Sequence, residues 1–169
     1  PSEQVTLDPQ TANLNLVVDH KTVSFLGGKV TPRDTSKRFT GSPSVLGSQG
    51  FTSGRHYWEV NVGTEGSWAV GVALESVPRA ACFSLLRSEK VWALHLDWDG
   101  QYTAECQVPF QVLVWEKLQK IRVCLDYDRG RVTFYNAKDM TQILQFKATF
   151  TEKVFPYFCL WSRGSLIKL

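Results

Sequence analysis

The side chains of this chain that could carry out chemistry are few and far apart. The three histidines stand at positions 20, 56 and 95, and none has a partner at the spacing that metal ligands adopt. Asp97 and Asp99 could pair two carboxylates, but a solvated turn explains their spacing better. No glycine-rich loop leads into a helix to hold phosphate, and no G-x-S-x-G elbow presents a nucleophile. The sequence therefore predicts a domain with no catalytic residue, no metal site and no cofactor.

Residues 53–60 read Ser-Gly-Arg-His-Tyr-Trp-Glu-Val, which is typical of a turn that runs directly into a strand. Gly54 can adopt the positive φ that closes a turn, and the aromatic and β-branched residues after it suit a half-buried strand. Because side chains alternate along a strand, His56, Trp58 and Val60 share one face. We expect a buried Trp58 to anchor this strand, with His56 as part of the scaffold.

Short strand-like runs recur between turn signals along the chain, and this spacing is typical of an all-β sandwich or barrel. Asp126–Gly130 predicts a tight hairpin with Gly130 in the left-handed conformation. Only Glu116–Gln119 and Phe83–Ser88 have a pattern that fits a helical turn. The expected strands are Leu14–Val18, Thr22–Phe25, His56–Val62, Trp68–Ala73, Val91–Leu96, Lys120–Asp126, Val132–Tyr135, Ile143–Phe146 and Phe155–Trp161.

Length, charge and cysteine content further limit the class of protein to which this chain can belong. A chain of 169 residues can bury about two thirds of its unfolded surface as one domain. The net charge of +3 is too small to imply a nucleic-acid partner by itself. Cys82, Cys106, Cys124 and Cys159 are far apart, so we expect free thiols in a reducing compartment and a cytoplasmic location. No apolar stretch approaches the roughly 20 residues that span a bilayer, so no membrane partner is expected.

Several short motifs stand in a fixed order along the chain. They are Val5–Pro9, Arg38-Phe39, Val45–Gly47, Ser53–Val60, Trp68–Val72, Leu125–Asn136 and Val154–Phe158. In this order and spacing they resemble the landmarks of the PRY-SPRY (B30.2) domain, which is found at the C-terminus of tripartite-motif (TRIM) proteins and butyrophilins. The resemblance covers almost the whole chain.

The resemblance implies a bent β-sandwich of two antiparallel sheets, formed by a PRY part over about residues 1–50 and a SPRY part over 51–169. It implies a non-catalytic module that binds a peptide, loop or terminus of a target protein on a concave face and variable loops. In TRIM proteins such a domain selects the substrate of an E3 ubiquitin ligase, and the resemblance extends this expectation to a ligase that acts in innate immunity. The RING lies outside this chain, the isolated domain is expected to be a monomer, and the parent is expected to dimerise through a coiled coil.

The antibody-binding member of the family indicates where a partner would contact this chain. The positions that match His95 and Asp97 look to be aromatic contacts there, and Trp98 stands beside them in this sequence. The position that matches Ala69 is acidic there. Because this chain has His95 and Asp97 at positions that match aromatic contacts in the relative, we do not expect it to bind antibody Fc. His95 lies on the less apolar face of its strand and is interpreted as a surface contact, with a structural histidine as the alternative.

Two loops extend the expected partner-binding surface. The loop after Phe158 offers Trp161 and Arg163, the residue types most enriched at interface hot spots. A core position is the alternative for Trp161, because buried tryptophan is common in sandwiches. The apolar loop at Val77–Ala81 departs from the basic pattern of relatives and leads to Phe83, Leu85 and Leu86. We expect at least one of these three to be exposed and Phe83 to contact a partner, with burial against the sheet as the alternative.

The segment Thr40–Ser44 matches a region that forms part of a phosphoantigen pocket in butyrophilins. It lacks the aromatic and histidine residues expected there, so phosphoantigen sensing is disfavoured. Ser42 and Ser44 remain candidates for contact with a protein partner.

An RNA-binding accessory domain is the alternative function. Lys29, Arg33, Lys37 and Arg38 cluster within ten residues, and some relatives of this fold contact RNA. The cluster lacks interleaved aromatic residues for base stacking, so protein recognition is favoured. Salt discriminates the two functions, because binding driven by phosphate weakens steeply as salt rises.

Overall fold

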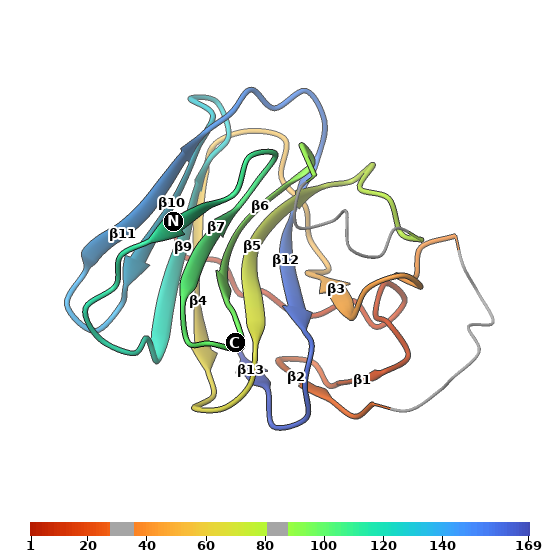
Figure 1. Cartoon of the computed structure of the whole chain (residues 1–169). Coiled ribbons are helices and arrows are strands. Elements are labelled where there is room, and N and C mark those ends of the chain that lie inside the picture. The colour runs from red at the N-terminus through yellow and green to blue at the C-terminus, as the bar shows by residue number, and fades with distance from the viewer. Residues whose placement is uncertain (28–35, 81–87) are drawn as a thin grey trace.

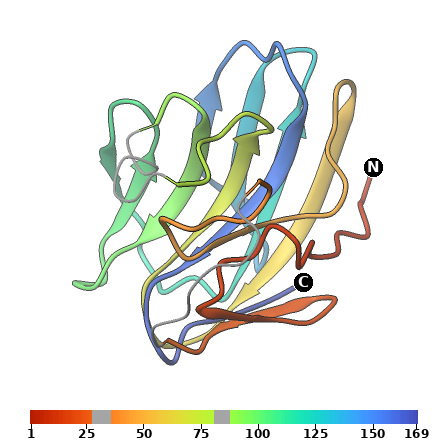
Figure 2. The same ribbon diagram turned by 90° about the vertical axis from the view of Figure 1, so that its right-hand side faces the viewer.

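Two antiparallel β-sheets stacked face to face form the computed structural model, which describes residues 1–27, 36–80 and 88–169 (Figures 1 and 2). The strand order of the larger sheet is β1 (Leu16–Val18), β2 (Thr22–Phe25), β13 (Leu166–Lys168), β4 (Arg55–Val62), β9 (Lys120–Asp126), β10 (Arg131–Asn136) and β11 (Thr141–Lys147). The order of the smaller sheet is β3 (Ser44–Leu46), β12 (Val154–Leu160), β5 (Trp68–Leu74), β6 (Val91–Leu96), β7 (Tyr102–Glu105) and β8 (Phe110–Val112). The predicted bent sandwich is confirmed.

The helical turn expected at Glu116–Gln119 is wrong. This segment crosses from the smaller sheet to the larger one without helix, because the side chain of Leu118 is buried and its backbone N–H donates to the Tyr102 hydroxyl at 2.9 Å. The turn expected at Phe83–Ser88 falls almost wholly outside the described residues. Within the described ranges the chain contains no helix, and so none that could span a bilayer.

Strand alternation builds the main core between the sheets. Trp58 and Val60 of β4 point inward and are almost completely buried, as the alternation predicts. The ring of Phe51 stacks on His56 with centroids 3.9 Å apart, and His56 also contacts Glu3 through Nδ1 at 2.6 Å. His56 is therefore held inside the scaffold.

The hairpin from β9 to β10 shows why a glycine is needed at its end. Gly130 has φ 66°, and a Cβ at this position would lie 1.7 Å from the carbonyl oxygen of Ala148. Both the backbone conformation and the space exclude a side chain, so the predicted role of Gly130 is confirmed.

A second, smaller core lies on the outer face of the six-stranded sheet. It contains Phe39, Leu46, Tyr157 and Cys159 together with small and β-branched residues of β5 and β6. The rings of Phe39 and Tyr157 meet edge to face with centroids 6.2 Å apart. Part of this outer face is therefore covered by the chain before β3.

Candidate functional site

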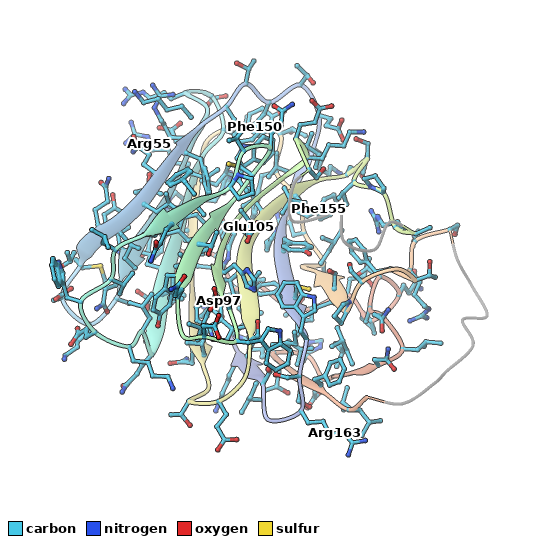
Figure 3. All side chains as sticks on the ribbon, viewed as in Figure 1. Arg55, Asp97, Glu105, Phe150, Phe155 and Arg163 are labelled. Atoms are coloured by element: carbon cyan, nitrogen blue, oxygen red, sulfur yellow. The ribbon has the colours of Figure 1, made fainter. Side chains whose placement is uncertain are left out.

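The uncovered part of the outer face centres on His95, near the end of β6. Alternation sends Leu94 and Leu96 into the main core and turns His95 outward. The strand register places His95 directly opposite Ala69 of β5 and Thr103 of β7. Figure 3 shows Glu105 and Phe155 on the strands of this sheet, with Asp97 at the end of β6.

Both ring nitrogens of His95 are held. Nδ1 lies 2.9 Å from Oε1 of Glu105, and Nε2 lies 3.2 Å from Oγ of Ser67. The Ser67 hydroxyl donates to the carbonyl of Leu96 at 2.7 Å, so it accepts from Nε2–H. The side chains of His95 and Glu105 are only 13% and 7% exposed, and the pair fixes the orientation of the imidazole ring.

The indole of Trp161 rests against the ring of His95 above β5. Their centroids are 4.8 Å apart and the planes are tilted by 47°. Ala69 lies on β5, between β6, which carries His95, and β12, which ends one residue before Trp161, and only a methyl group projects there. The small side chain of Ala69 therefore lets His95 and Trp161 meet, and Trp161 stays half-buried beside the second core.

Serine side chains fix the loop that follows Trp161. The backbone N–H of Ser67 donates to Ser162 Oγ at 3.1 Å, and the hydroxyl of Ser165 donates to the Ser67 carbonyl at 3.2 Å. A Cβ at Gly66 would lie 2.1 Å from Ser165 Oγ, so no side chain fits there. Arg163 is exposed on this loop and lies at the foot of the molecule in Figure 3. The loop thus presents Arg163 from a fixed base.

Trp98 lies on a different surface from His95 and Trp161. Oδ1 of Asp97 accepts the backbone N–H groups of Asp99 and Gln101, at 2.9 Å each, and so closes the turn after β6. Trp98 stands on this turn with 70% of its surface exposed, and it lines a hollow at the end of the sandwich. The single site expected from the sequence is divided into an outer-face site and an end-of-sandwich site.

Three predicted contact residues lie beneath the surface. Ala69 and Ser44 are fully buried and Ser42 nearly so. Ser42, Ser44 and the hydroxyl of Tyr157 form a buried chain of hydrogen bonds of 2.9 and 2.8 Å. In this structure they support the second core and offer a partner no surface.

The predicted residues Phe83, Lys29 and Arg33 fall outside the described residues. Of the remaining basic pair, Lys37 is exposed, whereas Arg38 donates to the carbonyl of Ala12 at 2.6 Å. Arg38 is therefore partly engaged in holding the N-terminal segment.

Sequence reasoning missed Glu105 and Ser67, which orient His95. The only signal was the alternation in Tyr102–Glu105, which turns Thr103 and Glu105 to the same face. Because β7 is only four residues long, this alternation was too short to be recognised.

The thiol beneath this face is unreactive. Burial raises the pKa of Cys159 to about 12, although hydrogen bonds with Ser44 and Tyr157 act in the opposite direction. A thiol with this pKa stays protonated near neutral pH and is a poor nucleophile. The arrangement around His95 and Trp161 is suited to binding.

Family models and relatives identify the family of this chain. Residues 55–168 match the family model described as SPRY domain, and residues 5–51 match PRY, the SPRY-associated domain. The chain is 40% identical over 158 residues to mouse E3 ubiquitin-protein ligase TRIM69, with 92% of this chain and 31% of TRIM69 covered. It is 40% identical over 169 residues to mouse tripartite motif-containing protein 10, with coverage of 98% and 34%.

A third relative and two solved structures extend the likeness. The brain form of nuclear factor 7 from Xenopus laevis is 43% identical over 153 residues, with 89% of this chain and 25% of that protein covered. The chain thus spans between 25% and 34% of the length of these three relatives. The PSpry domain of TRIM65 superimposes with a TM-score of 0.85 at 24% identity, covering 99% of this chain and 90% of that one. A stonustoxin structure superimposes with a TM-score of 0.85 at 27% identity, and the match covers 99% of this chain and 27% of the stonustoxin chain.

Proposed function

This chain belongs to the SPRY family and carries the SPRY-associated PRY segment, and from this premise we propose that it selects the target of a longer TRIM-type E3 ubiquitin ligase. SPRY domains of TRIM proteins are protein-interaction modules. We take the domain itself to be non-catalytic, with ligase activity supplied by a RING elsewhere in the parent protein.

The contact between His95 and Trp161 carries this proposal. An indole that is half-exposed and already oriented loses little conformational entropy when a partner covers it. Tryptophan and arginine supply a large contact area with a directional polar group, and Arg163 stands two residues from Trp161. The surface fits a loop or peptide that places an apolar group on Trp161 and an acidic group near Arg163.

Affinity capture with the purified domain tests the outer-face site. We expect bound proteins to survive a change from low to high salt and to be lost with Trp161→Ala, because a small aromatic interface depends little on ionic strength. Arg163→Glu provides a second variant, since an exposed charge on a fixed loop can be reversed without unfolding the domain.

The matched control is Tyr135→Ala, which truncates a partly buried aromatic residue on the larger sheet. Its melting temperature is measured together with those of Trp161→Ala and Arg163→Glu. Capture that is unchanged in both Trp161→Ala and Arg163→Glu would remove the outer face from consideration. Capture dominated by RNA that high salt removes would instead favour the basic segment at positions 29–38.

The proposal also includes expectations about the longer parent protein. A cytoplasmic ligase, dimeric through a coiled coil and acting in innate immunity, is the parent that fits a TRIM-type domain. The parent carrying Trp161→Ala should then fail to ubiquitinate the captured protein while retaining autoubiquitination. Equal ubiquitination by both forms would contradict a targeting role for the outer face.

A further inference from the structure

Exposed apolar side chains gather at one end of the sandwich. Of the nine large apolar side chains exposed among the described residues, four stand on the segments that meet at this end: Trp98 after β6, Leu113 and Trp115 between β8 and β9, and Met140 between β10 and β11. Trp115 is 96% exposed, Leu113 78% and Trp98 70%. A cluster of this kind marks a binding surface, because isolated soluble domains rarely leave large apolar groups in contact with water.

The exposure of Leu113 and Trp115 does not arise from a loose segment. The next three residues anchor the chain: Glu116 accepts from Asn136 at 3.0 Å, the Lys117 amino group donates to the Thr64 carbonyl, and Leu118 is buried. The segment between β8 and β9 is therefore held at its C-terminal side. Trp115 projects into solvent from a fixed base.

Two hollows flank Trp115. The first, about 410 Å³, lies between Trp115 and Trp98 and is also lined by Asp97 and Glu116. The second, about 440 Å³, lies between Trp115 and β11, with the apolar side chains of Leu113, Leu118 and Ile143 in its lining. We call the surface formed by Trp98, Trp115, Leu113 and these hollows the tryptophan groove.

The first hollow has the chemistry of a cation site. Indole faces attract ammonium and guanidinium groups, and a nearby carboxylate strengthens this attraction. Asp97 supplies a carboxylate that has no ion pair among the described residues, since its Oδ1 only accepts backbone N–H groups. The one cation in the lining, Lys117, has its amino group on the Thr64 carbonyl.

We propose that the tryptophan groove binds an extended peptide segment with a lysine or arginine side chain between Trp98 and Trp115 and an aliphatic side chain in the second hollow. The cation is matched by Asp97 and the two indoles, and the aliphatic group by Leu113 and Ile143. This surface goes beyond the outer-face site around His95 and gives the domain a second contact with its own chemistry.

Fluorescence anisotropy with short labelled peptides tests the groove. The probes are four heptapeptides of Gly-Leu-Gly-X-Gly-Leu-Gly, in which X is arginine, lysine, norleucine or glutamate. We expect the arginine and lysine peptides to bind about tenfold tighter than the other two, because only a cation gains from the indoles and Asp97. Trp115→Ala should abolish this difference.

Asp97→Asn separates charge from structure. An asparagine side-chain oxygen still accepts from Asp99 and Gln101, so the turn is retained while the negative charge is lost. We expect Asp97→Asn to weaken the arginine and lysine peptides and to leave the norleucine peptide unchanged.

Trp161→Ala is the control that separates the two proposals. Trp161→Ala should leave the affinity for the peptides unchanged, whereas Trp115→Ala should leave affinity capture through the outer-face site unchanged. Equal affinity for all four peptides, or tight binding that survives Trp115→Ala, would overturn the proposal. So would sedimentation showing that the domain dimerises and that Trp115→Ala makes it monomeric, because the groove would then be an interface between copies.

Discussion

The imidazole of His95 has partners at both nitrogens, so its orientation is a property of the folded chain before any target arrives. Glu105 at the end of β7 and Ser67 just before β5 hold it at 2.9 and 3.2 Å. The outward direction of His95 could be predicted from the alternation of β6. Its partners could not, because strand pairing brings Glu105 and Ser67 to it from 10 and 28 residues away.

Glu105→Ala tests the pair at the scale of the residue. Removing one member of a buried pair leaves the other poorly solvated, so we expect the free energy of unfolding to fall by about 1 to 3 kcal/mol. Urea denaturation measures the change. Glu59→Ala is the control, since Glu59 pairs with Arg122 and Lys120 at a more exposed position and should cost less than about 1 kcal/mol. An equal loss of unfolding free energy in Glu105→Ala and Glu59→Ala would contradict a special role for the buried pair.

At the scale of the elements, every strand of six or more residues could be predicted from the sequence, whereas four of the six strands with three or four residues could not. Three of the predicted strands, including β6 and β9, agree at both ends with the structure. The missed strands β3, β7, β8 and β13 have three or four residues each, too few to show a period of two. The direction of Trp98 could not be predicted for a related reason: the turn after β6 interrupts the alternation that located His95.

Gly71 in the middle of β5 gives a prediction for a single element. A Cβ there would lie 2.1 Å from the carbonyl oxygen of Trp92 and 2.6 Å from the Cα of Ala93, both backbone atoms of the neighbouring strand. We expect Gly71→Ala to destabilise the domain by roughly 3 kcal/mol or more, because backbone cannot move aside within a paired sheet. Thermal unfolding of the variant and of the unmodified domain measures this loss of stability.

The control is Gly63→Ala, where the nearest atoms would lie 3.5 Å away at ordinary contact distance. Its melting temperature should stay close to that of the unmodified domain. A similar small shift in Gly71→Ala would show that β5 and β6 can separate more easily than the register indicates.

For the whole molecule, folding buries, wholly or in part, several groups that ionise at high pH. Burial raises the pKa of Tyr157 well above its ordinary value, raises that of Cys159 to about 12, and also raises those of Tyr102 and Cys124. In the unfolded chain these thiols and phenols ionise at about pH 8.5 and 10. The folded state therefore holds more protons than the unfolded state at alkaline pH.

Stability should consequently be constant near neutral pH and fall above about pH 9, with a slope approaching 1.4 kcal/mol per pH unit for each group. Urea denaturation at a series of pH values measures this slope. Cys159→Ala lowers stability at every pH by leaving a cavity, but it should make the first part of the alkaline decline shallower. An unchanged slope would mean that Cys159 does not resist ionisation in the folded state.

The placement of β13 between β2 and β4 has a consequence for biosynthesis. Thr22–Phe25 leaves the ribosome well before Leu166–Lys168, its partner on one side, has been translated. At a rate of about 5 to 20 residues per second, the delay is on the order of 7 to 29 s. During that time β1 and β2 have only each other, and a two-stranded hairpin is marginal in water. The nascent domain is thus expected to depend on chaperone protection until translation has passed β13.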